Sequence, residues 1–240
     1  GISSNISYNL SMALIPALGS AAIFGLVYNM VQTESSRIRY AMTGGIMAAL
    51  MLGVVSNLEG ILEFVRANGM GSDRFWDWVR IDGLSGPTPT LTESWRPEEF
   101  WWWWRASRVI NTVEGGQIVD YTIHEFPLFS YILGDLHPHV MSTPFILLFI
   151  AACWNYFRSP LAIWTKFGVR SHLPILVIGL LLGGLAFTNM WDLPIFASLV
   201  MATTALKSYS ARCYSVWGLI RDAVLSGTVV VGVAMLLILP

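Results

Sequence analysis

The amino-acid sequence predicts an all-α membrane protein with about six transmembrane helices and a long Trp-rich segment outside the membrane. Of its 240 residues, 55% are hydrophobic and only 12% are charged, whereas about 25% of a soluble domain is charged. Five stretches of 18 or more residues contain no Asp, Glu, Lys or Arg, and about 20 apolar residues cross the hydrocarbon core as a helix. The hydrophobicity also excludes intrinsic disorder. The net charge of −1 excludes binding of nucleic acid through bulk charge.

The charge-free stretches locate the expected helices along the chain. We predict membrane helices near residues 9–31, 40–58, 139–157, 173–189, 193–208 and 219–240. The uncharged stretch from which the fifth helix is predicted has only 14 residues, which is short for a membrane crossing. Buried helices of a soluble protein are the alternative, but uncharged runs of this length rarely recur five times in a soluble fold. Residues 1–240 are therefore expected to form one membrane domain, in which residues 59–138 are an extracytoplasmic segment with interfacial helices.

Basic residues in the short connections predict the orientation, because the cytoplasmic loops of membrane proteins are enriched in Lys and Arg. The connections 32–39, 158–172 and 207–222 hold eight of the fourteen basic residues. Residues 59–138 hold twelve of the fifteen acids and have a net charge of −6. We therefore predict a multi-pass protein of the plasma membrane. Its basic connections would be cytoplasmic, and both the acidic segment and the turn 188–194 would lie outside.

The two ends of the chain predict that it is a piece of a longer protein. It begins with Gly1 rather than an initiator Met, and no basic region precedes the first apolar run, so we expect no signal peptide. Pro240 closes the last predicted helix without a tail.

Within residues 59–138, the pattern predicts several short elements and one Trp-rich helix. Pro97-Glu98-Glu99 is typical of a helix start, and we expect this helix to run through Trp101–Trp104 to Ile110. Four consecutive Trp residues beside an Arg favour a helix that lies in the membrane interface. The alternative is a lipid site, in which Arg105 and Arg108 lie on one helix face and bind a lipid phosphate while the Trp rings line its tail.

His and acidic residues gather before the third membrane helix. Pro138 disfavours helical backbone at His137, so Asp135 and His137 are expected in extended backbone on one side of the chain. Together with His139 they offer three functions: binding a divalent metal ion, proton transfer, or binding a phosphate. A plain helix start capped by Asp135 is the alternative. Glu125 is either a proton-transfer group or a surface acid.

Asp192 forms a second candidate site with its neighbour Asn189. It is the only Asp, Glu, Lys or Arg between Arg170 and Lys207, and a carboxylate between two apolar helices is energetically costly, which marks it as a functional candidate. The alternative is structural, because Asp two residues before Pro194 is also typical of a helix start.

The motifs at these sites also resemble a known family. They are Asn9–Asn29, Thr122–Pro127, Gly134–Val140 and Phe187–Pro194, and they are similar to the uncharacterised bacterial and archaeal "YYY" membrane protein family over most of the chain. The resemblance implies a polytopic protein similar to the GT-C superfamily of glycosyltransferases, which use polyprenyl-phosphate-linked sugars on the non-cytoplasmic face. Their catalytic carboxylate usually lies in the first outer loop. Here that loop, like the triple-Tyr motif, would precede Gly1.

Two functions follow as hypotheses. In the first, the chain is all or part of a membrane glycosyltransferase that binds membrane lipids and a polyprenyl-phosphate sugar. Asp135, His137 and His139 would hold a divalent metal ion or the donor phosphate. Glu125 and Asp192 would orient the acceptor or transfer a proton. Arg105, Arg108 and Asn189 are expected to bind the phosphate or the lipid. In the second, the chain is a non-catalytic structural or accessory subunit of a larger membrane protein complex. A transporter is disfavoured because the ionisable groups lie near helix ends.

Overall fold

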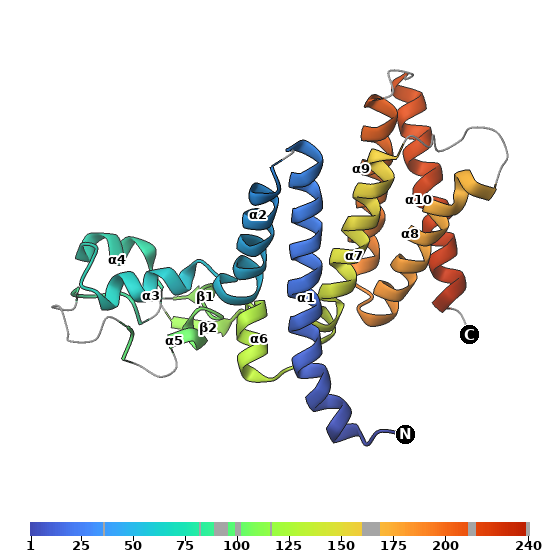
Figure 1. The fold of residues 1–240 in the computed structure, drawn as a ribbon. Helices are drawn as coiled ribbons and strands as arrows, with labels where there is room; N and C mark the ends of the chain where they lie inside the picture. Colours follow the sequence, from blue (N-terminus) through green and yellow to red (C-terminus); the bar gives the residue numbers. More distant parts are fainter. Residues whose placement is uncertain are drawn as a thin grey trace. The chain divides into compact units, whose positions relative to one another are not determined.

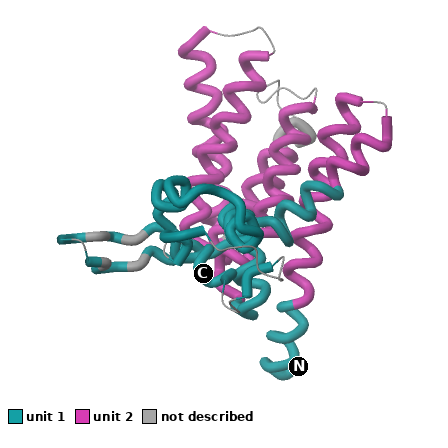
Figure 2. Tube along the Cα trace, turned by 90° about the vertical axis from the view of Figure 1, so that its left-hand side faces the viewer, with its two compact units in different colours: residues 1–12, 46–135 teal, residues 13–45, 136–240 magenta. Residues whose placement is uncertain are grey.

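The structure is a computed structural model that describes residues 1–35, 37–81, 83–88, 96–98, 102–115, 117–159, 169–210 and 215–238. The described residues are mostly helical (Figure 1). They divide into two compact units, which are coloured separately in Figure 2. Unit 1 comprises residues 1–12 and 46–135, and unit 2 comprises residues 13–45 and 136–240. Glu99 and Trp101 of the predicted Trp-rich helix, and Pro240 at the end of the last predicted helix, lie outside the described residues.

Helices stand at all six positions where the sequence predicts them: α1 (Ser4–Glu34), α2 (Ile38–Leu50), α7 (Pro138–Arg158), α8 (Val169–Thr188), α9 (Asp192–Ser210) and α10 (Val216–Ile238). A π-helix, η1 (Met51–Val55), continues α2. Among the described residues, four segments are long and apolar enough to cross a membrane: Ser4–Glu34, Ile38–Val55, Pro138–Arg158 and Val216–Leu236. Several membrane helices are thus present, and the total of six crossings stays a prediction.

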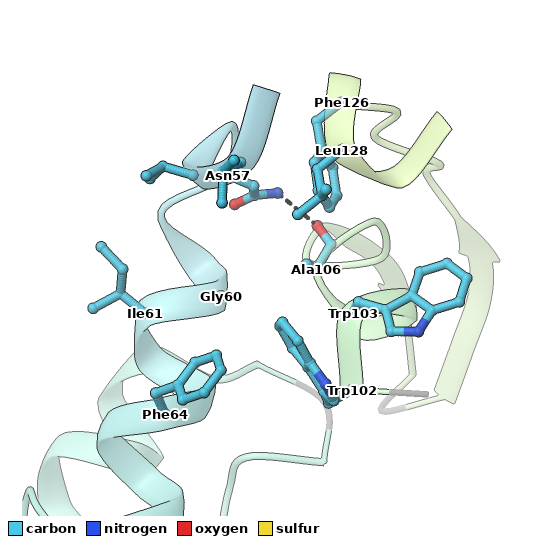
Figure 3. A pocket seen from close by; sticks show the side chains of 11 residues that line it. Asn57, Gly60, Ile61, Phe64, Trp102, Trp103, Ala106, Phe126 and Leu128 are labelled. Carbon is cyan, nitrogen blue, oxygen red and sulfur yellow. Dashed lines mark hydrogen bonds between the residues drawn. The ribbon is translucent and has the colours of Figure 1, made fainter. Parts of the chain in front are cut away.

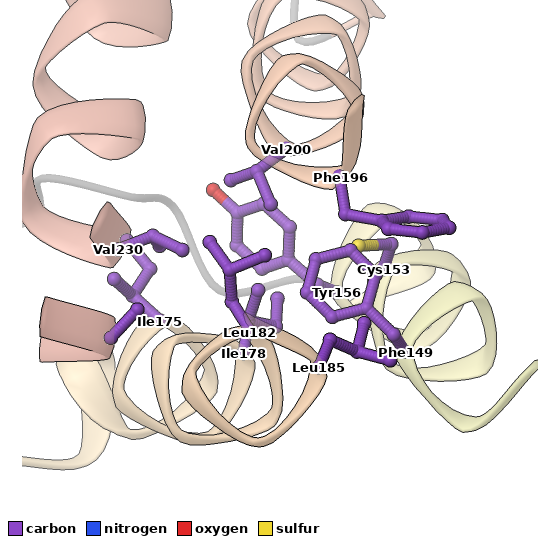
Figure 4. Packing of buried hydrophobic residues seen from close by; sticks show 11 residues of the cluster. Phe149, Cys153, Tyr156, Ile175, Ile178, Leu182, Leu185, Phe196, Val200 and Val230 are labelled. Carbon is purple, nitrogen blue, oxygen red and sulfur yellow. The ribbon is translucent and has the colours of Figure 1, made fainter. Parts of the chain in front are cut away.

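Four helices of unit 2, α7 to α10, pack around one apolar core (Figure 4). Phe149 of α7 and Phe196 of α9 meet with their ring centroids 5.4 Å apart. Leu182 and Leu185 of α8 and Val230 of α10 are fully buried in the same cluster. Because these helices are apolar on nearly every face, each can bury one face in the core and still present apolar side chains to lipid.

The basic ends of the unit 2 helices meet one another. Lys207, near the end of α9, donates a 2.7 Å hydrogen bond to the carbonyl of Tyr156 in the last turn of α7, where backbone carbonyls lack helical partners. Arg158 at the end of α7 pairs at 3.1 Å with Glu34 at the end of α1. Ser208 of α9 donates to Asp222 of α10 at 3.3 Å. The ends of α1, α7 and α9 and the start of α10 therefore lie together, as an alternating path of the chain requires.

Gly179 allows α8 and α10 to approach closely. Substitutions at Gly179 and at Gly184 of the same helix should therefore differ in their effect on stability. A Cβ atom added to Gly179 would lie 2.8 Å from Val233 Cβ, whereas one added to Gly184 would meet no atom within 4 Å. We expect Gly179→Val to lower the free energy of unfolding by about 1–3 kcal/mol through overpacking. Gly184→Val is the matched control in the same helix, and thermal unfolding in detergent measures both. Equal stabilities of the two variants would contradict the close helix contact.

Unit 1 contains short helices and one hairpin. Its helices are α3 (Glu59–Ala67), α4 (Asp73–Val79), α5 (Trp102–Arg105) and α6 (Pro127–Leu133), and its strands β1 (Asn111–Glu114) and β2 (Gln117–Tyr121) pair antiparallel. Trp76 is fully buried and forms a small core with Ile81 and Leu84. Ser72 begins α4 by accepting a hydrogen bond from the backbone N–H of Phe75.

The hairpin corrects two sequence-based predictions. The chain is not entirely α-helical, and the Trp-rich helix ends at Arg105 instead of continuing to Ile110. The physical reason is the turn chemistry that follows: Gly115 has a φ of 58°, a conformation that favours glycine. Val113 and Ile118 stand on either side of the Gly115-Gly116 pair. Two β-branched runs around Gly-Gly are a hairpin signal, so the sequence contained the information that this prediction missed.

Candidate functional site

An apolar cavity of about 160 Å³ lies within unit 1 (Figure 3). Its walls come from the end of η1, from α3, from α5 and from the start of α6, and its lining residues are Val54, Val55, Asn57, Gly60, Ile61, Phe64, Trp102, Trp103, Ala106, Phe126 and Leu128. An apolar cavity of about 150 Å³ can remain dry and accept a molecule of the size of benzene. The cavity is therefore suited to a piece of hydrocarbon rather than to a sugar or an ion.

Two polar residues at the end of η1 hold the cavity walls together. The Asn57 side chain accepts a 2.8 Å hydrogen bond from the backbone N–H of Glu59 at the start of α3, and its amide donates at 3.0 Å to the carbonyl of Ala106. Ser56 Oγ accepts at 2.9 Å from the backbone N–H of Leu128. Ser56 has a φ of 35°, which is unusual for a residue other than glycine. The sequence offered no signal for these roles, because both residues sit at the end of an apolar run.

The Trp run packs against the other helices of unit 1. Trp102 meets Phe64 of α3 edge to face, with ring centroids 5.3 Å apart. Trp103 and Trp104 lie 5.7 and 5.5 Å from the ring of Phe129 in α6. The aromatic rings therefore join α3, α5 and α6 and form one wall of the cavity. The position of this segment in a membrane interface stays a prediction.

Arg105 forms a buried ion pair with Glu63. Its Nε and Nη2 atoms lie 2.7 and 2.9 Å from the two carboxylate oxygens, a bidentate geometry typical of strong Arg–carboxylate pairs. The Glu63 side chain is 2% exposed and that of Arg105 is 23% exposed. A Cβ added to Gly83 would lie 2.7 Å from Arg105 Nη1, so the absence of a side chain there makes room for the guanidinium group. Arg105 thus connects α5 to α3.

Glu59 lies one helical turn before Glu63 and is also buried, with 6% of its surface exposed. The pKa of its carboxyl is raised to about 8, mainly by burial and secondly by the charge of Glu63. The charge of Arg105 lowers this pKa, but by less. A hydrogen bond between the Glu59 and Glu63 carboxyls also raises the pKa of Glu59. Glu59 therefore carries a proton at neutral pH. The sequence around Glu59 gives no signal of this role, since helical spacing does not reveal burial.

Arg108 and Glu125 are next to cavity-lining segments in the sequence, but neither side chain lines the cavity itself. The Arg108 guanidinium lies 4.0 Å from the centroid of the Trp104 ring, and its Nη1 donates to the hydroxyl of Ser107. Burial lowers the pKa of Arg108, while the charge of Glu125 acts in the opposite direction. The helix ends at Arg105, so the expected shared helix face of Arg105 and Arg108 is wrong. Glu125 immediately precedes Phe126, which lines the cavity.

In unit 2, Asp192 is the first residue of α9, as the sequence predicted for a helix start. Asn189 Nδ2 donates a 3.0 Å hydrogen bond to Asp192 Oδ1, and the backbone N–H of Asp192 donates to the Asn189 carbonyl at 3.0 Å. Asp192 is 7% exposed. Its second oxygen, Oδ2, is buried without a hydrogen-bond partner among the described residues. The helix start is confirmed, and the Asn189 amide holds one carboxylate oxygen of Asp192. The functional role of Asp192 stays a prediction.

His137 and His139 lie at the start of α7 with their ring centroids 5.6 Å apart. The φ of −61° and ψ of 152° at His137 confirm the extended backbone predicted from Pro138. His137 is the N-cap residue of α7, and its side chain makes no capping hydrogen bond. A cap by Asp135 stays a prediction. Asp135 belongs to unit 1, where its backbone N–H donates to Ser130 at the end of α6. Among the described residues, no group of three or more His, Cys, Asp and Glu side chains is placed to hold a metal ion.

The two candidate groups of unit 2 lie at different depths. Phe149 and Phe196 are in contact, and His139 precedes the first by ten residues while Asp192 precedes the second by four. At a rise of 1.5 Å per residue, His139 lies about 9 Å farther than Asp192 from the level of the Phe149–Phe196 contact. The structure therefore pairs Asn189 with Asp192 and His137 with His139, and keeps these two pairs apart.

The whole chain was also compared with known proteins. Residues 1–240 match the family described as "Uncharacterized membrane protein (DUF2298)". The chain belongs to the DUF2298 family. This membership, together with four segments of membrane-spanning length, confirms the predicted membrane protein with several apolar helices. Neither the curated proteins nor the solved structures contain a match to this DUF2298 chain.

Proposed function

We propose that the chain is the membrane part of a GT-C-like glycosyltransferase, which takes a sugar from a polyprenyl-phosphate donor on the non-cytoplasmic face of the plasma membrane. One observation carries the proposal: the aromatic cavity begins at Val54 and Val55, the last residues of the candidate membrane span Ile38–Val55. A prenyl chain that follows this span reaches a cavity of matching chemistry as it leaves the hydrocarbon core. The apolar walls supply its binding energy through the hydrophobic effect.

In this proposal, polar groups near the cavity handle the donor phosphate. Arg108 lies over the ring of Trp104, which follows the cavity-lining Trp103 in the chain, and stabilises the phosphate that leaves. Arg105 is paired with Glu63 and holds α5 in position. Glu125 accepts the proton of the acceptor hydroxyl, whose oxygen attacks the anomeric carbon. The bond between that carbon and the phosphate oxygen breaks, and the electron pair stays on the phosphate.

The residues of unit 2 have proposed roles at the acceptor side. The unpaired Asp192 oxygen and the Asn189 amide orient an acceptor hydroxyl. His137 and His139, exposed at the start of α7, contact the donor phosphate.

The second candidate function, a non-catalytic subunit of a membrane complex, rests on exposed aromatic residues around Asp192. Phe187 and Trp191 are both 82% exposed, and large apolar side chains gathered at one turn are typical of partner or lipid contacts. This function predicts no sugar transfer and loss of a co-purifying partner after Trp191→Ala.

A cavity-filling variant tests the enzymatic proposal. A Cβ at Gly60 would lie 3.6 Å from the Trp102 ring, so Gly60→Ala fits the cavity whereas Gly60→Leu fills it. With the full-length protein and a polyprenyl-phosphate-linked hexose labelled in the sugar, we expect Gly60→Leu to lower kcat/KM at least tenfold and Gly60→Ala to change it little. Asp135→Ala and His137→Ala are expected to lower kcat. Unchanged transfer by Gly60→Leu would contradict the proposed tail site, and no transfer by the unsubstituted protein with any polyprenyl sugar would support the subunit function.

A further inference from the structure

Unit 2 contains a cleft that reaches the end where its basic residues meet. A cleft of about 460 Å³ separates α1 from α7. Small and aliphatic residues line most of its length: Ala21, Ala22, Gly25, Leu26, Leu147, Leu148 and Ala151. Both walls are segments that can span a membrane, so lipid is the medium that surrounds them. The shape and chemistry of this part of the cleft match an acyl chain.

The other end of the cleft is polar and cationic. Asn29, Thr33, Asn155 and Arg158 line it. The Arg158 side chain is 46% exposed, and its partner Glu34 is 67% exposed, so this pair is solvated and weak. A guanidinium group has five N–H donors, and the pair with Glu34 uses one of them. The amide of Asn155 makes no hydrogen bond within the described part of the chain. Donors are thus available where the apolar part of the cleft ends.

A neighbouring cavity reaches the same two polar residues from the other side of α7. It has a volume of about 510 Å³, and Asn155 and Arg158 line it together with Leu173, Pro174 and Val177 at the start of α8. Two apolar clefts therefore converge on one Arg–Asn pair. A phospholipid has this arrangement of parts, with two acyl chains joined at one phosphate.

We propose that unit 2 binds an anionic diacyl phospholipid whose phosphate contacts Arg158 and Asn155 and whose chains occupy the two clefts beside α7. The charge at this end favours an anionic headgroup, since Lys207 at the end of α9 and Arg37 and Arg39 beside α1 add positive charge and Glu34 and Asp222 offset only part of it. Basic clefts between membrane helices are suited to such headgroups. Trp154, 5.8 Å from the Arg158 guanidinium, adds an aromatic ring at the same depth. The site does not depend on the sugar-transfer proposal and uses none of its residues.

Two glycines allow a matched test. A side chain at Gly25 meets no atom within 4 Å and points into a cleft that this residue lines. Gly232 of α10 likewise has no atom within 4 Å and lines neither cleft. Gly25→Leu therefore fills the cleft between α1 and α7, and Gly232→Leu is its control. Both substitutions raise helix propensity, so both variants should fold, which circular dichroism and size-exclusion chromatography verify.

The experiment is a titration of the detergent-solubilised protein with dioleoyl phosphatidylglycerol, dioleoyl phosphatidylcholine or inorganic phosphate, followed by native mass spectrometry. We expect phosphatidylglycerol to bind at least tenfold more tightly than phosphatidylcholine and phosphate alone not to bind. Gly25→Leu and Arg158→Gln should each weaken phosphatidylglycerol binding about tenfold, and Gly232→Leu should leave it unchanged. Equal binding of the two lipids, or unchanged phosphatidylglycerol binding by Gly25→Leu, would overturn the proposal.

Discussion

Replacing Glu59 with Gln is expected to make unit 1 more stable than the unsubstituted protein at pH 8.5, and equally stable at pH 4.5. The Glu59 carboxyl has an ordinary pKa of 4.5 and a pKa of about 8 in the folded chain. Between these values the folded state holds a proton that the unfolded state has released. The contribution of the Glu59 carboxyl to the free energy of unfolding is therefore full below pH 4.5, falls as the pH rises towards 8 and then stays level. The difference corresponds to on the order of 3–5 kcal/mol.

Thermal unfolding in detergent at several pH values measures this effect. Seven of the eleven Trp residues lie in residues 59–138, so intrinsic fluorescence reports mainly on this part of the chain. Glu34→Gln is the control, because the Glu34 side chain is 67% exposed and its replacement should leave the pH dependence of stability in place. A Glu59→Gln variant that still loses stability between pH 4.5 and 8 would show that another group binds the proton.

The second large effect is expected when the buried ion pair is broken on one side. Arg105→Met removes the guanidinium group that pairs with the Glu63 carboxylate and leaves an acid that is 2% exposed without this partner. Loss of one member of a buried pair costs about 3–5 kcal/mol of unfolding free energy.

The double variant Arg105→Met/Glu63→Met decides whether the cost comes from the unpaired charge. Two apolar side chains of similar volume should restore most of the lost stability, because a buried pair contributes little beyond a well-packed apolar contact. The exposed pair between Arg158 and Glu34 offers the comparison: Arg158→Met should cost less than about 1 kcal/mol. An additive double variant, as unstable as the sum of its single changes, would mean that packing rather than charge dominates the site.

The candidate residues were recognised from sequence to different extents. Asp192 and His137 could be placed because a proline follows each within two residues and limits the local backbone, and the structure confirms the helix start and the extended residue. The Arg105–Arg108 pair was misplaced because the helix end depends on the hairpin that follows it. Glu59 and Glu63 were overlooked as a functional pair. Their importance follows from burial, which depends on chain segments more than 40 residues away.

The sequence by itself determined that this chain belongs in a membrane and where its long helices lie. Uncharged runs of 18 or more residues are local features, and the cost of placing charges in hydrocarbon makes them decisive without tertiary contacts. Only the tertiary structure decided which of the few charged groups are buried. Glu59 retains its proton, and Arg105 is held by Glu63, because α3 and α5 come together and exclude water from both carboxyls. Desolvation depends on what surrounds a group in space, and a charge pattern along the chain does not contain that information.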